Sequence, residues 1–170
     1  SIAAIIPARK GSKGLSNKNL MELGGILLVD HSLIFAKSLN YLSNIILTSD
    51  SLDILSRADL YHVDKIIRPD EFATDTSTLV ETVLHALDEI FRRLKSSYSH
   101  VILLQPTYPF RCLNDVNNAI DRYLRNGNES MVAVSTMKEH PCECIHYKDS
   151  SNWRYLEKPP EKEGRQSYPD

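Results

Sequence analysis

The sequence has few cysteines, almost no net charge and no long apolar run. Its three cysteines are a small, odd set that cannot build a disulfide framework: Cys112, Cys142 and Cys144. With 20 basic and 22 acidic side chains the net charge is -2, so no overall basic field exists to attract nucleic acid or anionic membranes. No apolar run approaches the ~20 residues that span a bilayer, and the N-terminus lacks a signal-peptide pattern. We therefore expect a cytosolic protein that binds neither nucleic acid nor membranes.

What is present has the makeup of one globular domain with a sizeable core: 170 residues, of which 42% are hydrophobic and 25% charged. The chain begins with Ser1 rather than Met and stops at Asp170 after a polar stretch that contains proline. We therefore expect it to be part of a longer gene product.

Short apolar runs alternate along the chain with longer stretches of helical periodicity, which is typical of parallel strands joined by crossover helices. The apolar runs predict strands at residues 2–6, 45–48, 63–67, 101–104 and 131–135. The periodic stretches predict helices at residues 29–39, 51–60, 79–94 and 113–125. Four of the strands have continuous apolar residues, as strands covered on both faces do. The pattern favours a doubly wound α/β fold, Rossmann-like, with a mostly parallel sheet.

The ends of the predicted helices carry suitable residues. Asp50 or Ser51 is placed to cap the second helix, Thr76 or Ser77 the third, and Gly127 follows the fourth. After Ser135 the composition turns polar, with weak strand signals only at residues 145–147 and 153–156. We therefore divide the chain into an α/β core, residues 1–136, and a small C-terminal extension, residues 137–170.

The strongest local signal follows the first predicted strand directly. Gly11 and Gly14 allow the backbone to bend with its N–H groups turned inward, a shape that attracts anions. Four cations and two neutral hydrogen-bond donors lie in the same segment: Arg9, Lys10, Lys13 and Lys18, with Ser12 and Asn19. Such a stretch is often only a solvated loop, but here it stands at the carboxyl end of a parallel strand, where these folds bind ligands. It matches neither the Walker pattern nor the dinucleotide fingerprint. We expect it to bind a triphosphate.

The same segment resembles the signature loop of the CMP-sialic acid synthetase family, the cytidylyltransferases that activate acidic sugars. Further segments resemble family motifs in the same order. They are Arg68-Pro69 with Ala73–Ser77, Leu103–Arg111, the histidine–proline turn Glu139–Pro141, and Arg165–Pro169. The resemblance covers residues 2 to 141 and touches the end of the chain.

The resemblance implies a nucleotidyltransferase that moves CMP from CTP to the anomeric hydroxyl of an acidic nonulosonic sugar, with release of pyrophosphate and help from Mg²⁺. It implies that CTP is bound by Arg9, Gly11, Ser12, Lys13, Lys18, Asn19, Arg68 and Ser77. Arg9, Lys13 and Lys18 would stabilise the charge that builds on the phosphates. Gln105 and Arg165 would contact the sugar, and the extension, residues 137–170, would form a homodimer and part of the sugar site.

Several positions have a plainer interpretation or depart from the family. Arg68 is equally well placed for a surface ion pair with Asp70 or Glu71. A helix cap is the plainer role for Ser77, and we interpret Asp50 as a cap too. Arg111 is placed to cap or steady the turn that follows Gln105. Tyr108 stands where the family more often has Ser. The family holds its metal with a late acidic pair that this sequence does not reach, so we assign no metal ligand.

Alternate positions place His140, Cys142, Cys144 and His146 on one face of an extended strand. These are suitable zinc ligands. However, four of them along a straight strand span about 20 Å, too far to surround one ion. We therefore expect a strand in a subunit interface rather than a zinc site.

Two alternatives stay open at this point. One is the same chemistry on legionaminic, pseudaminic or 3-deoxy-manno-octulosonic acid. The other is a nucleotide-binding module without catalysis. CTP binding and pyrophosphate release in the presence of each sugar distinguish these hypotheses.

Overall fold

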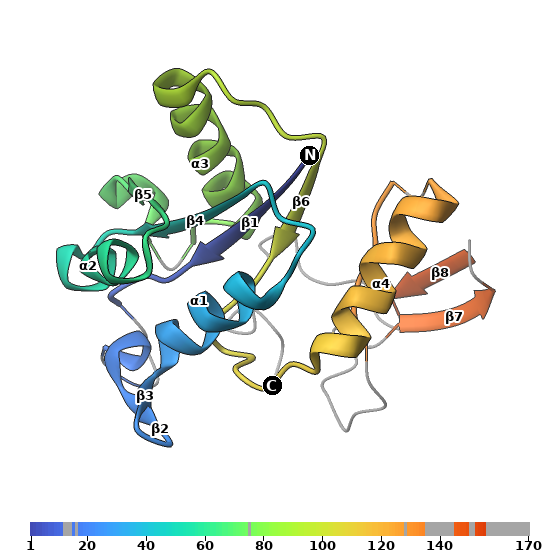
Figure 1. The fold of residues 1–170 in the computed structure, drawn as a ribbon, viewed down its shortest axis with the longest axis horizontal. Coiled ribbons are helices and arrows are strands. Elements are labelled where there is room, and N and C mark those ends of the chain that lie inside the picture. Colours follow the sequence, from blue (N-terminus) through green and yellow to red (C-terminus); the bar gives the residue numbers. More distant parts are fainter. Residues whose placement is uncertain are drawn as a thin grey trace. The chain divides into compact units, whose positions relative to one another are not determined.

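The computed structural model describes residues 1–11, 15, 17–74, 76–127, 129–134, 145–149 and 152–155. The chain divides into two compact units, Ser1–Gly127 and Asn128–Asp170. The first unit holds a sheet of four strands, which Figure 1 shows: β1 (Ile2–Pro7), β4 (Asn44–Ser49), β5 (Asp64–Ile67) and β6 (His100–Leu103). Four α-helices connect or follow them: α1 (Leu28–Ser38), α2 (Leu52–Tyr61), α3 (Leu79–Leu94) and α4 (Leu113–Asn126).

The strand order is β5-β4-β1-β6, and every neighbouring pair is parallel. The chain runs outward from β1 through β4 to β5 and then returns to the other side of β1 as β6. The order therefore reverses between β1 and β6. In doubly wound sheets, ligands bind outside the carboxyl ends of the strands at this kind of reversal.

Helices cover both faces of the sheet, which confirms the doubly wound prediction. The even-numbered residues of β1, such as Ala4 and Ile6, belong to a core cluster with residues of α1, α2 and α4. The odd-numbered Ala3 and Ile5 belong to a second cluster with Ala86 and Ile90 of α3. Because side chains alternate along a strand, one central strand contributes to both cores.

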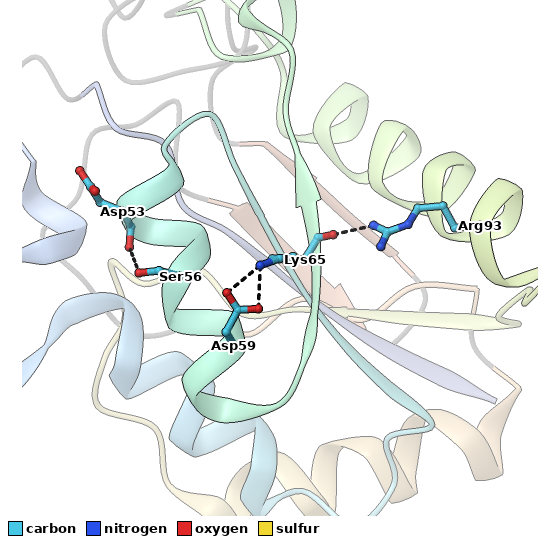
Figure 2. Close-up of polar contacts among 5 residues, drawn as sticks. All are labelled: Asp53, Ser56, Asp59, Lys65 and Arg93. Carbon is cyan, nitrogen blue, oxygen red and sulfur yellow. Dashed lines mark hydrogen bonds and ion pairs between the residues drawn. The ribbon is translucent and has the colours of Figure 1, made fainter.

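Polar contacts tie α2 and α3 to the outer strand β5 (Figure 2). The Lys65 ammonium of β5 donates to both carboxylate oxygens of Asp59 in α2 at 2.6 Å. From α3, the Arg93 guanidinium donates to the Lys65 carbonyl at 2.8 Å. Within α2, the Ser56 hydroxyl donates to the Asp53 carbonyl at 2.7 Å. These contacts are exposed and contribute little stability each, but those made by Lys65 join both helices to one strand.

The predicted helices are confirmed within one residue at each end, and α3 begins and ends where the periodicity placed it. Gly127 is confirmed as the end of α4, with a φ of 61°. Ser51 is confirmed at the N-cap position of α2, whereas the predicted caps of α3, Thr76 or Ser77, are wrong. The cap of α3 is Thr78, which exchanges two hydrogen bonds with Glu81 in a capping box. Ser51 precedes α2 without a capping side-chain bond.

Four of the five predicted strands of the core are confirmed. The fifth is wrong for residues 131–134, which are exposed and form no strand. β-propensity reflects packing against neighbours, so an apolar run without a ladder partner is not held as a strand. The expected burial on both faces holds for β1 but not for β5 and β6, where Ile67 is 66% and Val101 is 38% exposed. These two strands are the outer ones of the described sheet.

Smaller elements complete the described parts. A short helix, η1 (Lys18–Leu20), leads into the hairpin of β2 (Glu22–Leu23) and β3 (Ile26–Leu27), whose turn residues Gly24 and Gly25 both have positive φ. A second short helix, η2 (Asp70–Phe72), follows β5. In the second unit β7 (Ile145–Asp149) pairs antiparallel with β8 (Asn152–Tyr155), which confirms the two weak strand signals. None of the described helices is long and apolar enough to cross a membrane.

Candidate functional site

The segments that leave the carboxyl ends of the four parallel strands carry most of the residues singled out from the sequence. Arg9 follows β1, Asp50 follows β4, Arg68 follows β5 and Gln105 follows β6. The carboxyl ends of parallel strands meet at one edge of a sheet. The fold thus brings together side chains that are far apart in the sequence.

The loop after β1 is held where it begins. The Ala8 amide donates to the Thr48 carbonyl at 3.0 Å, and the Lys10 amide donates to Asp50 Oδ1 at 2.7 Å. The buried Asn19 side chain reaches back and donates from Nδ2 to the Arg9 carbonyl at 2.8 Å. These three bonds fix the backbone of residues 8–10 against β4 and η1.

The bend that the sequence assigned to Gly11 and Gly14 involves residues 12–14, which lie outside the described residues, and of the two glycines only Gly11 is described. This residue has no positive φ, and a side chain added to it would meet no described atom within 4 Å. Asn17 takes the left-handed conformation, with φ of 50°, just before η1. Asn tolerates this conformation better than most residues because its short side chain bonds locally. Lys18 of η1 is half-buried.

Arg68 is a buried cation, only 5% exposed. Its Nη2 donates to the Thr48 carbonyl at 2.9 Å, but its Nε is buried without a hydrogen-bond partner. The alternative of a surface ion pair with Asp70 or Glu71 is wrong, because the side chain lies inside and no such pair occurs among the described residues. Burial lowers the pKa of Arg68; the Asp50 carboxylate raises it, and the Arg9 cation lowers it further. This guanidinium is therefore under-compensated.

The segment after β5 folds into a turn that meets the first loop. Arg9 Nη1 donates to the Thr74 carbonyl at 3.0 Å. The Ser77 hydroxyl donates to the Glu71 carbonyl at 3.0 Å and accepts from the Thr74 amide at 3.1 Å. The interpretation of Ser77 as a helix cap is wrong, since its hydroxyl closes the 71–77 turn and Thr78 caps the helix.

After β6, Arg111 organises the turn that carries Gln105. Its Nη2 donates to the Gln105 carbonyl, its Nη1 donates to the Ser32 hydroxyl at 3.2 Å, and its guanidinium lies 5.6 Å from the centre of the Phe35 ring. Burial lowers the pKa of Arg111. The prediction that Arg111 steadies this turn is confirmed. The aromatic rings of Tyr108 and Phe110 beside it are 61% and 82% exposed.

Some predicted residues lie outside the described part of the chain: Ser12, Lys13, Gly14, Arg165, His140, Cys142 and Cys144. His146 lies on β7, opposite Arg154. In the described ranges, no three His, Cys, Asp or Glu side chains gather as metal ligands would.

Known proteins share the sequence pattern of this chain. Residues 3–157 match the family model described as cytidylyltransferase. The chain belongs to the cytidylyltransferase family. This result confirms the family resemblance that the loop after β1 and the later motifs indicated.

Curated relatives of this cytidylyltransferase chain act on several sugar acids, according to their names. It is 35% identical over 144 residues to the CMP-N,N'-diacetyllegionaminic acid synthase of Legionella pneumophila, covering 84% of this chain and 61% of that protein. It is also 35% identical over 144 residues to the N-acylneuraminate cytidylyltransferase of Escherichia coli, covering 85% and 33%. The pseudaminic acid cytidylyltransferase of Campylobacter jejuni is 28% identical, covering 89% and 65%. The chain thus spans from about a third to about two thirds of these relatives.

Solved structures of low identity share the fold. A CMP:2-keto-3-deoxy-manno-octonic acid synthetase in complex with CTP is 19% identical, with a TM-score of 0.59 over 74% of this chain and 48% of that one. A cytidylyltransferase of Leptospira borgpetersenii is 16% identical, with a TM-score of 0.54 over 74% and 49%. These two likenesses support the α/β nucleotidyltransferase fold.

Two residues of this candidate site were not assigned to it from the sequence. Asp50 reaches the loop after β1 instead of capping α2, and the Thr74 carbonyl receives Arg9. The available signal for Asp50 was its place directly after a strand, the same signal that singled out Arg68. No sequence signal points to a backbone carbonyl such as that of Thr74.

Proposed function

We propose that the protein transfers CMP from CTP to the anomeric hydroxyl of an acidic nonulosonic sugar of the sialic acid type and releases pyrophosphate. Membership of the cytidylyltransferase family supports this reaction, as do the names of the relatives at 35% identity. The observation that carries the proposal is Arg68, a buried and under-compensated guanidinium at the carboxyl edge of the sheet, whose pKa the nearby Arg9 cation lowers further. Such a group favours an anionic ligand.

The residues around this edge divide the work of binding CTP. Arg9, Gly11, Lys18, Asn19 and Arg68 would bind the nucleotide together with Ser12 and Lys13, and Ser77 would hold the turn that Arg9 contacts. In-line attack on the α-phosphate moves charge onto the leaving pyrophosphate, which Arg9, Lys13 and Lys18 would stabilise. Preformed donors are effective in this role because they need little reorganisation during the reaction.

For the acceptor we propose that Gln105 and Arg165 contact the sugar acid. Gln105 suits this role because it follows β6 on the far side of the strand-order reversal from Arg68. The neighbouring Tyr108 and Phe110 are exposed. The acceptor class includes sialic, legionaminic, pseudaminic and 3-deoxy-manno-octulosonic acids, in keeping with the relatives named above.

We further propose that Mg²⁺ assists by neutralising the pyrophosphate. No three ligand side chains gather among the described residues, and Mg²⁺ usually takes only one or two carboxylates besides substrate phosphates, so we assign it no protein ligand. The chemistry assigned to this chain is therefore charge stabilisation by its own cations. We also propose that the enzyme works in the cytoplasm. In this proposal residues 1–136 form the nucleotide-binding core, and residues 137–170 form an extension through which two copies make a homodimer.

The test is to incubate the purified protein with CTP, Mg²⁺ and each sugar acid in turn, and to measure pyrophosphate. Release with one acid and not with neutral sugars supports the proposal and identifies the acceptor. CTP binding without turnover on any acid would instead assign a nucleotide-binding module. Failure to bind CTP at all would contradict both functions.

A further inference from the structure

The β1–β4 ladder continues past the strands in an unusual way. In register, Pro7 lies opposite Thr48, and the next backbone bond runs from the Ala8 amide to the Thr48 carbonyl. In a parallel ladder, the following bond on this side would join the Lys10 amide to the carbonyl of Asp50. The structure puts the carboxylate in that place, since Lys10 N donates to Asp50 Oδ1 at 2.7 Å.

The reason lies in where the two chains go next. After β4 the chain turns into α2, which begins at Leu52, while the chain after β1 continues into the loop. The side chain of Asp50 bridges the gap that opens between them. Asp50 is only half-buried, and its carboxylate makes no capping bond to α2.

The same peptide unit is held from its other side. The carbonyl of Arg9 and the amide of Lys10 belong to one peptide plane. Asn19 Nδ2 donates to the Arg9 carbonyl at 2.8 Å, and Asp50 accepts from the Lys10 amide. With both of its polar groups bonded, this plane cannot rotate freely. The direction in which the chain enters the loop is therefore fixed.

The charge of Asp50 suits its surroundings as well. It lies near Arg68, whose pKa it raises against the effect of burial, and it bonds the backbone of a lysine that follows Arg9. A carboxylate beside a phosphate site would ordinarily repel the ligand. Among these cations its repulsion is offset, and its hydrogen bond remains useful.

We propose that Asp50 is a positioning residue of the triphosphate site: with Asn19 it clamps the Arg9–Lys10 peptide and so orients the loop before the phosphates arrive. The proposal rests on the function proposed above and goes beyond it by assigning a role to a carboxylate. Asp50 acts through the loop and does not touch the nucleotide.

The test compares Asp50→Ala with Asp50→Asn. Both variants lose the charge, but the amide oxygen of Asn can still accept from Lys10, so the difference between them isolates the hydrogen bond. Calorimetry with CTP, inorganic tripolyphosphate and cytidine should show that Asp50→Ala binds the first two about tenfold more weakly than Asp50→Asn does. Cytidine should bind both variants equally. Asp53→Ala, which removes an exposed carboxylate from the first turn of α2, is the matched control and should bind all three as the wild type does.

A second measurement gives a result in the wild type even where a variant fails to fold. Hydrogen exchange of the Lys10 amide should be slow in the ligand-free wild type and in Asp50→Asn, and faster in Asp50→Ala. Equal tripolyphosphate affinity in the two Asp50 variants, or a freely exchanging Lys10 amide in the folded wild type, would overturn the clamp. If the wild type binds neither CTP nor tripolyphosphate but its Lys10 amide is protected, the proposed function fails and Asp50 is only a structural bridge.

Discussion

The two ends of the same parallel sheet treat their polar groups in opposite ways. At the amino end, Asn44 Nδ2 donates to Asp64 Oδ2 and to the Tyr98 hydroxyl, each at 2.8 Å. At the carboxyl end, Arg68 Nε and Thr48 Oγ1 are buried without hydrogen-bond partners. Buried polar groups are nearly always paired, so unpaired ones need an explanation. At the amino end these polar groups bond one another, whereas at the carboxyl end a buried donor and a buried hydroxyl are left available for a ligand.

The difference teaches that stability and binding are separable in this sheet. Polar groups that bond one another at the amino end stabilise the fold, and those hydrogen-bonding atoms are not available to a ligand. Groups left under-compensated at the carboxyl end cost stability, and an anionic ligand would offset that cost. Variants at the two ends should therefore change different measurements.

The largest effect is expected at Arg68. Replacing it with Gln removes a charge-assisted contact of about 3 kcal/mol, so CTP should bind about a hundredfold more weakly. The melting temperature should hold or rise, because a buried cation is removed and the Thr48 carbonyl keeps its bond from Ala8. Calorimetry and thermal unfolding check both parts. Unchanged CTP affinity would remove Arg68 from the site.

A somewhat smaller effect is expected at Lys13. Replacing it with Ala should weaken CTP by about 2 kcal/mol, about thirtyfold, if its ammonium contacts the phosphates. The matched control is Lys37→Ala, which removes the same charge from α1, where Lys37 bonds the Tyr61 carbonyl. Titration of CTP against both variants checks the prediction. Equal affinities in the two would count against a role for Lys13.

At the amino end the comparison predicts the converse. Replacing Asn44 with Ala removes three side-chain hydrogen bonds: those that Nδ2 donates to Asp64 and Tyr98, and the one that Oδ1 accepts from the Ile45 amide. The free energy of unfolding should fall by about 1–2 kcal/mol, while CTP affinity stays as in the wild type. Chemical denaturation and calorimetry measure the two quantities. A loss of CTP affinity in a folded Asn44→Ala variant would show that the ends are coupled.

The smallest effect concerns pH and Tyr41, which leads into β4. Its hydroxyl donates to Asp121 Oδ1 at 2.6 Å, and this bond, with a lesser effect of burial, raises the pKa of Tyr41 above 10.0. Above pH 10 the unfolded chain loses this proton first, so the folded chain binds more protons and stability falls as pH rises. Tyr41→Phe should lessen that fall without changing CTP affinity at neutral pH. Unfolding curves at pH 9 to 11 test this, and identical slopes would contradict it.

Much of the fold followed from periodicity, because the residues that bury a helix or strand also define its repeat. The apolar stripe of α3 located both of its ends, and Gly127 located the end of α4. Residues 131–134 show the limit: their apolar side chains favour a strand, but a strand also needs a partner, which is a tertiary property.

The candidate site was only partly predictable for a related reason. The position of Arg68 after a strand was readable, but its burial depends on how β5 and its neighbours pack. Asp50 and Ser77 looked like helix caps because their residue types favour caps. Asp50 instead accepts a hydrogen bond from Lys10, which is far away in the sequence, and Ser77 donates one to Glu71 within an irregular turn. Local sequence patterns encode neither contact.

The most direct measurement is a crystal structure of the protein soaked with CTP. The account predicts the triphosphate on the loop after β1, with its charge facing Arg9 and Arg68 and the Arg9–Lys10 peptide still held by Asn19 and Asp50. CTP bound at another edge of the sheet, with Arg68 Nε still without a partner, would contradict it.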